Sequence, residues 1–81
     1  MTWDVRVSRA AERDLTKLPK GVVLRAENAF LQIAENPVRP RPGADILKMR
    51  DVAQLYRLPF GEYRIQYVLE GHRVTITSVK H

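Results

Sequence analysis

Three runs of alternating apolar and polar residues in the last thirty positions constrain the fold more than any other feature. The runs cover residues 55–60, 63–69 and 74–77, and short segments containing Gly61 and Gly71 separate them. A period of two places every second side chain on the same face of a strand, and runs joined by tight turns pair as antiparallel neighbours. The sequence therefore predicts a three-stranded antiparallel meander with one apolar face that a second layer must cover.

An N-terminal strand and two helices are expected to complete the structure. Residues 2–7, "TWDVRV", alternate as a half-buried strand does. Ser8 is a suitable N-cap for a first helix that Pro19 stops, and residues 20–35 carry the apolar stripe of a second helix. We predict an α+β fold in which an N-terminal strand and a two-helix antiparallel hairpin pack on a mainly antiparallel sheet.

The segment between the helices and the meander is rich in proline. "NPVRPRPGAD", residues 36–45, cannot form a central strand and is interpreted as a crossing from the helices to the sheet. Residues 46–49 are expected to add a short strand edge. The whole chain, residues 1–81, is expected to be one domain.

Composition limits the classes of function. The 81 residues contain no cysteine, which excludes disulfides and thiolate metal sites, and no apolar stretch approaches bilayer length. A chain this short has little room for an enclosed cofactor pocket, so no cofactor, metal or small-molecule ligand is expected. The net charge of +5 favours RNA, DNA or an acidic protein as partner, or simply a solubilising surface. We expect a cytoplasmic protein without membrane association.

The faces of the meander predict how its strands pair. A four-residue loop at Pro59–Glu62 places Arg57 opposite Arg64 and keeps polar side chains together on the face that the helices leave uncovered. For the second hairpin, a two-residue turn at Glu70–Gly71, or a loop longer by an even number, keeps apolar residues opposite apolar residues.

Two arginines side by side on a sheet need compensation, because directly opposed like charges cost up to about 1 kcal/mol. A nearby carboxylate from Glu62, Glu70, Asp45 or Asp51 is one explanation. A bound phosphodiester is the other, because guanidinium groups match phosphate oxygens in a bidentate manner. Lys48, Arg50 and Lys80 are candidates for extending such a patch.

Other site patterns are missing from the sequence. It contains no glycine-rich phosphate loop, no nucleophile elbow and no paired-histidine zinc motif. Arginine and lysine can nevertheless promote RNA cleavage without a metal. The ribose 2′-hydroxyl is an internal nucleophile, so the protein has only to align it, stabilise the developing charge and move protons.

The sequence resembles the RelE/ParE superfamily of bacterial and archaeal toxins. The most specific element is "LYRLPFGEYRIQY", residues 55–67, and "SRAAERDLTKLP", the proline-rich crossing, "ILKMRDVAQ" and "ITSVKH" extend the resemblance over essentially the whole chain. It implies a small RelE-like α+β domain. RelE-type members are ribosome-dependent mRNA endonucleases that act by 2′-hydroxyl attack without a metal and are neutralised by an antitoxin.

The resemblance also implies roles for individual residues. Arg57 and Arg64 match catalytic basic positions. Lys48 and Arg50 match positions that contact RNA. Pro59 falls where some RelE members have a lysine.

The resemblance ends differently from the family pattern. Members commonly continue through a basic pair to a tyrosine proposed as general base, whereas this chain ends at His81. His81 is therefore the third catalytic candidate, Lys80 joins the RNA-binding set, and the tyrosine has no counterpart. We expect either a shortened chain or a weaker, differently organised catalysis. Two alternatives stay open: a ParE-like inhibitor of DNA gyrase, and a member that only binds antitoxin or nucleic acid.

Overall fold

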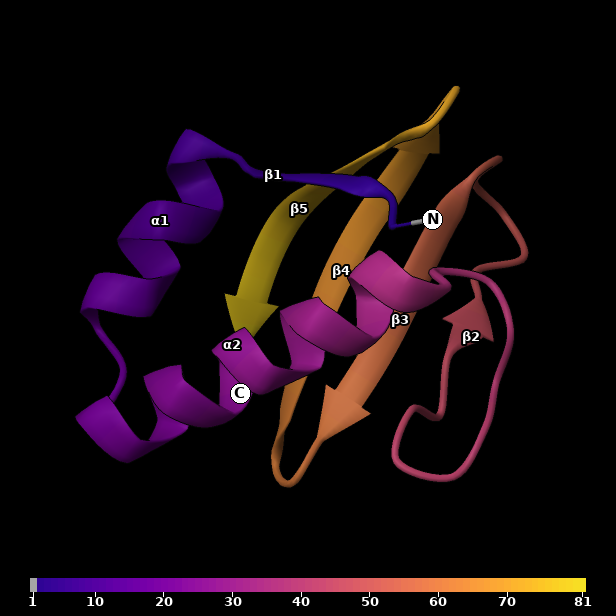
Figure 1. Ribbon diagram of the computed structural model, residues 1–81. Coiled ribbons are helices and arrows are strands. Elements are labelled where there is room, and N and C mark those ends of the chain that lie inside the picture. Colours follow the sequence, from indigo (N-terminus) through magenta and orange to yellow (C-terminus); the bar gives the residue numbers. More distant parts are fainter. Residues whose placement is uncertain (1) are drawn as a thin grey trace.

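The computed structural model describes residues 2–81 as two helices and a mixed five-stranded sheet (Figure 1). The elements in chain order are β1 (Asp4–Val7), α1 (Arg9–Thr16), α2 (Lys20–Glu35), β2 (Leu47–Lys48), β3 (Leu55–Phe60), β4 (Tyr63–Glu70) and β5 (Arg73–Lys80). The strand order is β1-β5-β4-β3-β2, with β1 parallel to β5 and all other neighbours antiparallel. The α+β fold predicted from the sequence is confirmed.

The helix boundaries follow from local chemistry. The hydroxyl oxygen of Ser8 accepts a hydrogen bond from the backbone N–H of Ala11 at 3.1 Å, which satisfies one of the free donors at the start of α1. Pro19 separates α1 from α2. α2 ends at Glu35, because its C-cap Asn36 precedes Pro37 and a residue preceding proline avoids the helical conformation. These boundaries agree with the sequence prediction. Among residues 2–81, no helix is long and apolar enough to span a membrane.

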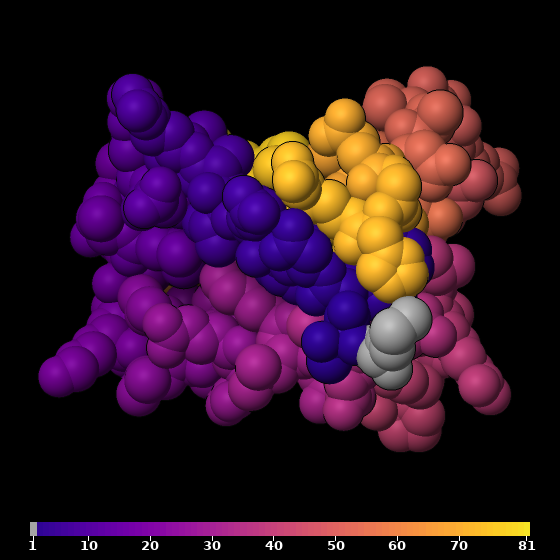
Figure 2. All heavy atoms as spheres, turned by 45° about the horizontal axis from the view of Figure 1, so that its top comes forward, coloured from indigo at the N-terminus to yellow at the C-terminus, as the bar shows by residue number. Residues whose placement is uncertain are grey.

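The helices occupy one face and one side of the sheet. Figure 1 shows α2 crossing the sheet, and α1 lying at the β5 side, away from β2. Ala26 and Ala29 of α2 are buried and small, which allows the helix to approach the strands closely. The inward sheet residues of the core are Tyr56, Leu58, Ile65, Tyr67, Val74, Ile76 and Val79. Figure 2 shows the indigo N-terminal segment packed against the yellow C-terminal strand, as the β1–β5 pairing requires.

The first hairpin is tighter than predicted. Its loop has two residues, Gly61 and Glu62, and Arg57 pairs with Gln66, so the prediction that Arg57 lies directly opposite Arg64 was wrong. The φ of Gly61 is +59°, a conformation that glycine adopts without strain and that suits the first position of a two-residue hairpin turn. Pro59 is tolerated in β3 because β2 pairs only with Tyr56 and Arg57, which leaves Pro59 on a free edge.

The second hairpin is also shifted from the predicted register. Its turn is Gly71–His72 instead of Glu70–Gly71, so Tyr67 lies opposite Ile76 rather than Val74. A displacement by two positions keeps each side chain on its predicted face.

A β-bulge between Gln66 and Tyr67 then shifts the pairing by one more residue. Thr77 is the extra residue on β5, and its hydroxyl donates to the carbonyl of Gln66 at 3.2 Å. As a result, Ile76 and Val79, three positions apart, both point into the core.

The proline-rich crossing is fastened to both layers. The hydroxyl of Tyr67 donates to the carbonyl of Pro37 at 2.7 Å, in a buried position. The guanidinium of Arg41 donates to the carbonyls of Gln32 at 2.6 Å and Asn36 at 3.0 Å, at the C-terminal end of α2. A cation at this end also interacts favourably with the helix dipole. The crossing therefore delivers β2 to the sheet edge in a defined position.

Candidate functional site

Three of the predicted site residues lie on the uncovered face of the sheet: Arg57, Arg64 and Lys80. We call the surface that they form the basic face. Arg64 pairs with Lys80 across β4 and β5, so these two side chains share a face. Arg57 is opposite Gln66, two residues from Arg64, so the two arginines are diagonal neighbours. Diagonal neighbours on a sheet are about 7–8 Å apart, which leaves space for one phosphate group between two long side chains.

Neither arginine has an aspartate or glutamate partner among the described residues. Among residues 2–81, no aspartate or glutamate oxygen lies within 4.0 Å of the guanidinium of Arg57 or Arg64. Arg64 donates to the backbone carbonyl of His81 at 2.8 Å. Arg57 is half-buried and makes no side-chain hydrogen bond to any other described residue. Within residues 2–81, the compensation by an acidic side chain that the sequence left open is therefore not present; Arg57 has no polar partner, and Arg64 is held by the main-chain oxygen of His81.

The side chain of His81 lies beside the β3–β4 turn, against Tyr63, which alternates with Arg64 and therefore belongs to the opposite side of the sheet from the basic face. Its Nε2 is 3.5 Å from a carboxylate oxygen of Glu62, and its ring meets the ring of Tyr63 edge-on, with centroids 5.1 Å apart. An imidazole beside a carboxylate can act as a proton donor or acceptor. Glu62 thus contacts the histidine and not an arginine.

Lys80 is held to α1. Its ammonium is 4.0 Å from one carboxylate oxygen of Asp14, and the other oxygen accepts a hydrogen bond from the backbone N–H of Val79 at 3.0 Å. At this point β1 has already ended, so Asp14 supplies an acceptor that a neighbouring strand would otherwise provide. The end of the basic face is thereby fixed to the first helix.

The two other predicted RNA-binding residues do not join this face. Lys48 pairs with Tyr56, whose side chain points to the helices, so Lys48 is on the opposite side of the sheet from Arg57. The residue next to Arg57 on the uncovered face is Leu47, which is half exposed. Arg50 lies in the exposed loop between β2 and β3. The predicted extension of the patch through Lys48 was wrong. Lys48 would share the face of Arg57 only if it paired with Arg57 itself, the position that Leu47 occupies.

Sequence reasoning did not include two polar neighbours of the arginines. Gln66 lies opposite Arg57, and its amide oxygen accepts from the hydroxyl of Ser78 at 3.3 Å. Both side chains are on the uncovered face between the charged residues. Alternation along β4 predicts the face of Gln66. Ser78 reaches the same face only because of the bulge. The one sequence signal for that bulge is the three-residue spacing of the apolar Ile76 and Val79.

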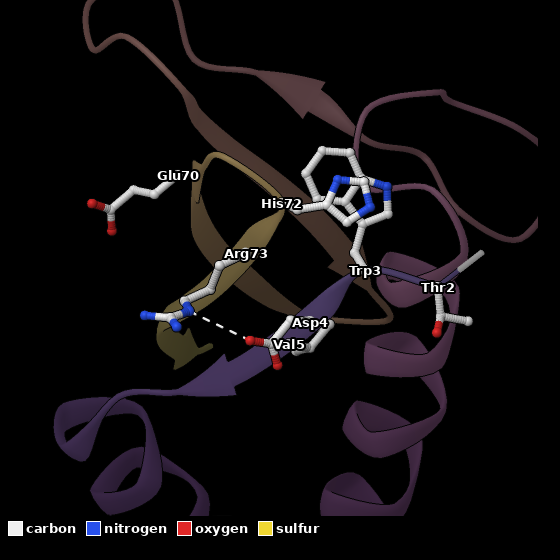
Figure 3. Close-up of a pocket in the computed structure, with 7 residues that line it drawn as sticks. All are labelled: Thr2, Trp3, Asp4, Val5, Glu70, His72 and Arg73. Carbon is white, nitrogen blue, oxygen red and sulfur yellow. Dashed lines mark hydrogen bonds and ion pairs between the residues drawn. The ribbon is translucent and has the colours of Figure 1, made fainter.

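A shallow pocket lies at the other end of β4 and β5, remote along both strands from Arg64 and Lys80 (Figure 3). It is lined by Thr2, Trp3, Asp4, Val5, Glu70, His72 and Arg73. The rings of Trp3 and His72 stack with centroids 4.6 Å apart, and Asp4 bridges Arg6 and Arg73. The hydrogen bond from Arg6, aided by Arg73, lowers the pKa of Asp4 below the ordinary value of 3.8. Asp4 and Arg73 of this pocket are already paired with each other, and the pocket contains none of the predicted site residues.

The basic face and the neighbouring His81 have groups that phosphodiester chemistry can use. Two guanidinium groups without an aspartate or glutamate partner in residues 2–81 can stabilise the charge of a phosphate or of a pentacoordinate transition state. His81 beside Glu62 can transfer a proton. No group of three or more histidine, aspartate or glutamate side chains suited to a metal ion is found in the described part of the chain.

The match to known proteins covers nearly the whole chain. The family model described as the ParE toxin of the type II toxin-antitoxin system parDE matches residues 5–81. The chain belongs to this toxin family. The toxin is also 26% identical over 69 residues to the RelE1 toxin homologue of Methanocaldococcus jannaschii, covering 85% of this chain and 76% of the relative.

Solved structures of RelE toxins share the fold of this toxin. The TM-score is 0.82 at 27% identity to the archaeal RelE–RelB complex of Pyrococcus horikoshii, covering 99% of this chain and 94% of the other. It is 0.79 at 28% identity to the toxin–antitoxin complex RelBE2 of Mycobacterium tuberculosis, covering 100% and 99%. The family description names ParE and the solved relatives are RelE proteins, so the comparisons establish the RelE/ParE toxin superfamily.

Proposed function

We propose that this toxin is a ribosome-dependent mRNA endonuclease. The observation that carries the proposal is the diagonal pair of the half-buried Arg57 and the exposed Arg64 on the uncovered face, with no aspartate or glutamate oxygen of residues 2–81 within 4.0 Å. Guanidinium groups at this spacing fit one phosphate of a single RNA strand. The proposed substrate is messenger RNA presented by the ribosome in the cytoplasm.

The proposed chemistry uses the arginines of the basic face and His81 beside the β3–β4 turn. The ribose 2′-oxygen attacks the adjacent phosphorus, the bond to the 5′-oxygen of the next nucleotide breaks, and a cyclic phosphate and a 5′-hydroxyl result. Arg57 and Arg64 stabilise the negative charge that builds up on the phosphate oxygens. His81, oriented by Glu62, exchanges a proton with the attacking or the leaving oxygen. Lys80 and the exposed Arg50 are proposed as further RNA contacts.

The proposed protein partner is a cognate antitoxin. The solved relatives are RelE proteins in complex with RelB antitoxins. By analogy, an antitoxin that covers the basic face would block substrate and supply the carboxylates that Arg57 and Arg64 lack.

Primer extension on messenger RNA from translating ribosomes tests the proposal. The wild-type toxin should introduce new ends in the message, and Arg57→Ala and Arg64→Ala should each reduce the cleavage rate by about 100-fold or more, because each removes a donor to the transition state. Arg73→Ala is the matched control, since it removes an arginine from the other end of the uncovered face and should leave cleavage unchanged. Circular dichroism should show the same fold in all variants.

Intact message at a stoichiometric dose of toxin contradicts the proposal. The second candidate is inhibition of DNA gyrase, which the ParE description of the matching family favours. A supercoiling assay separates the two functions. Inhibited supercoiling together with uncut message would establish the gyrase function, and activity in neither assay would indicate a toxin that only binds its partner.

A further inference from the structure

Helix α1 carries a stripe of three cations that point away from the protein. Arg9, Arg13 and Lys17 are spaced by four residues, all three are exposed, and we call them the α1 stripe. Residues four apart lie above one another on a helix, about 6 Å apart along its axis. Lys17 continues the row because its backbone keeps a right-handed helical conformation (φ −92°, ψ −3°).

This arrangement is locally unfavourable. Like charges four residues apart on a helix repel each other, and both neighbouring pairs of the α1 stripe have this spacing. Arg9 is also the first residue of α1, where the helix dipole favours anions and opposes cations. Lys17 lies at the end where the dipole favours a cation, so the unfavourable terms concern Arg9 and the mutual repulsion within the stripe.

No acidic side chain compensates the stripe. Within residues 2–81, no carboxylate oxygen lies within 4.0 Å of Arg9, Arg13 or Lys17. Glu12 is exposed on the same helix and forms no ion pair within this distance. The other carboxylate of α1, Asp14, is turned to β5 and occupied by Val79 and Lys80. A bound polyanion would neutralise all three charges together.

The composition of the surface favours RNA over an acidic protein. Protein interfaces have an apolar centre, often with aromatic residues. The large exposed apolar side chains of residues 2–81 are Leu24, Leu31, Val38, Leu47 and Val52, and none of them belongs to α1. A regular row of cations without apolar neighbours is suited to the phosphates along a nucleic-acid backbone, which require charge and no hydrophobic contact.

We propose that the α1 stripe is a second RNA contact, separate from the basic face, that binds the phosphate backbone of double-helical RNA. This identification of the RNA rests on the proposed function: the double-helical RNA is that of the ribosome, and the basic face receives the single-stranded message. Asp14 joins the two surfaces, because it belongs to α1 and contacts Val79 and Lys80 at the end of β5. RNA bound by α1 would therefore hold the basic face in a fixed orientation.

Binding to an RNA duplex of about 20 base pairs, without ribosomes, tests this inference. The variant Arg9→Gln/Arg13→Gln/Lys17→Gln should bind the duplex about tenfold or more weakly than wild type at about 0.1 M salt. Its slope of log K against log salt concentration should be smaller by about 1 for each lost phosphate contact. Its melting temperature should equal or exceed that of wild type, because a repulsion has been removed, so unfolding would not explain the loss.

A matched control removes the same number of charges elsewhere. Arg6→Gln/Arg39→Gln/Arg73→Gln leaves α1 intact and should keep most of the duplex affinity, because Arg6 and Arg73 are already paired with Asp4. An equal loss in both variants, or an unchanged salt slope in the stripe variant, would overturn the inference. The same holds if the stripe variant keeps its RNA affinity and loses affinity for an acidic antitoxin. Loss of duplex binding in the stripe variant alone supports the inference. If the wild-type toxin leaves message on ribosomes intact, that separate result overturns the proposed function and not this inference.

Discussion

Replacing Tyr67 by phenylalanine removes one hydroxyl from the centre of the core. The Tyr67 side chain is 0% exposed, and its hydroxyl donates to the carbonyl of Pro37 at 2.7 Å. This bond joins β4 to the proline-rich crossing, which is 30 residues away in sequence. The ring itself stays in place in Tyr67→Phe, so the variant isolates the hydrogen bond.

The magnitude follows from the burial of both partners. A hydrogen bond contributes about 0.5–1.5 kcal/mol to stability, and a buried acceptor that loses its donor adds a desolvation penalty. Pro37 is buried, so its carbonyl has little access to water after the change. We expect Tyr67→Phe to lower the free energy of unfolding at pH 7 by about 1.5 kcal/mol, which is about 6–12 °C in melting temperature for a protein of this size.

The difference between wild type and variant should disappear at alkaline pH. Burial, with a smaller contribution from neighbouring Tyr56, raises the pKa of Tyr67 above the ordinary value of 10.0. Above about pH 10 the unfolded chain releases this proton while the native protein retains it, so Tyr67 then lowers stability by about 1.4 kcal/mol per pH unit. Phenylalanine has no such proton. The two stability curves should therefore meet near about pH 11.

Urea unfolding between pH 7 and pH 11 measures both effects. Tyr63→Phe is the control, because the Tyr63 ring is only half-buried and its hydroxyl makes no hydrogen bond within residues 2–81. It should change stability by less than about 0.5 kcal/mol at each pH. A constant difference between wild type and Tyr67→Phe over the whole range would refute the reasoning, since the alkaline loss would then come from other groups.

Two further variants test the hairpin and the end of β5. Gly61→Ala should destabilise the protein more than Gly71→Ala. Both glycines have a φ of +59°, but only at Gly61 would a new Cβ meet a side chain, 3.2 Å from Nη2 of Arg25. Thermal melts of the two variants measure the difference, and equal losses of stability would show that Arg25 moves away freely. Asp14→Ala should lower the free energy of unfolding by about 1–2 kcal/mol, because it leaves the N–H of Val79 without an acceptor. Asp14→Asn keeps an acceptor oxygen and should retain most of the stability. Equal losses of both variants in urea unfolding would assign the effect to the charge of Asp14.

The candidate site was predictable in its residues but not in its geometry. Alternation along β3 and β4 places Arg57 and Arg64 on the uncovered face whichever loop joins the strands, provided that the loop length is even. Whether the two arginines lie directly opposite each other depends on the exact number of residues in that loop. That length depends on Gly61 adopting a positive φ and on Pro59 lying beside a free sheet edge, and the short β2 that leaves the edge free is a property of the whole sheet.

The sequence by itself determined the helices, the strands and the two faces of the meander, because periodicity, the Ser8 cap and the prolines act over a few residues. It also determined the toxin superfamily through residues 55–67. Only the tertiary structure decided which polar groups meet. The bulge at Gln66 and Tyr67 brings Lys80 opposite Arg64, and α1 replaces β1 beside the end of β5. Such contacts join segments far apart in the chain, so their register is set by packing of the core and not by local preference.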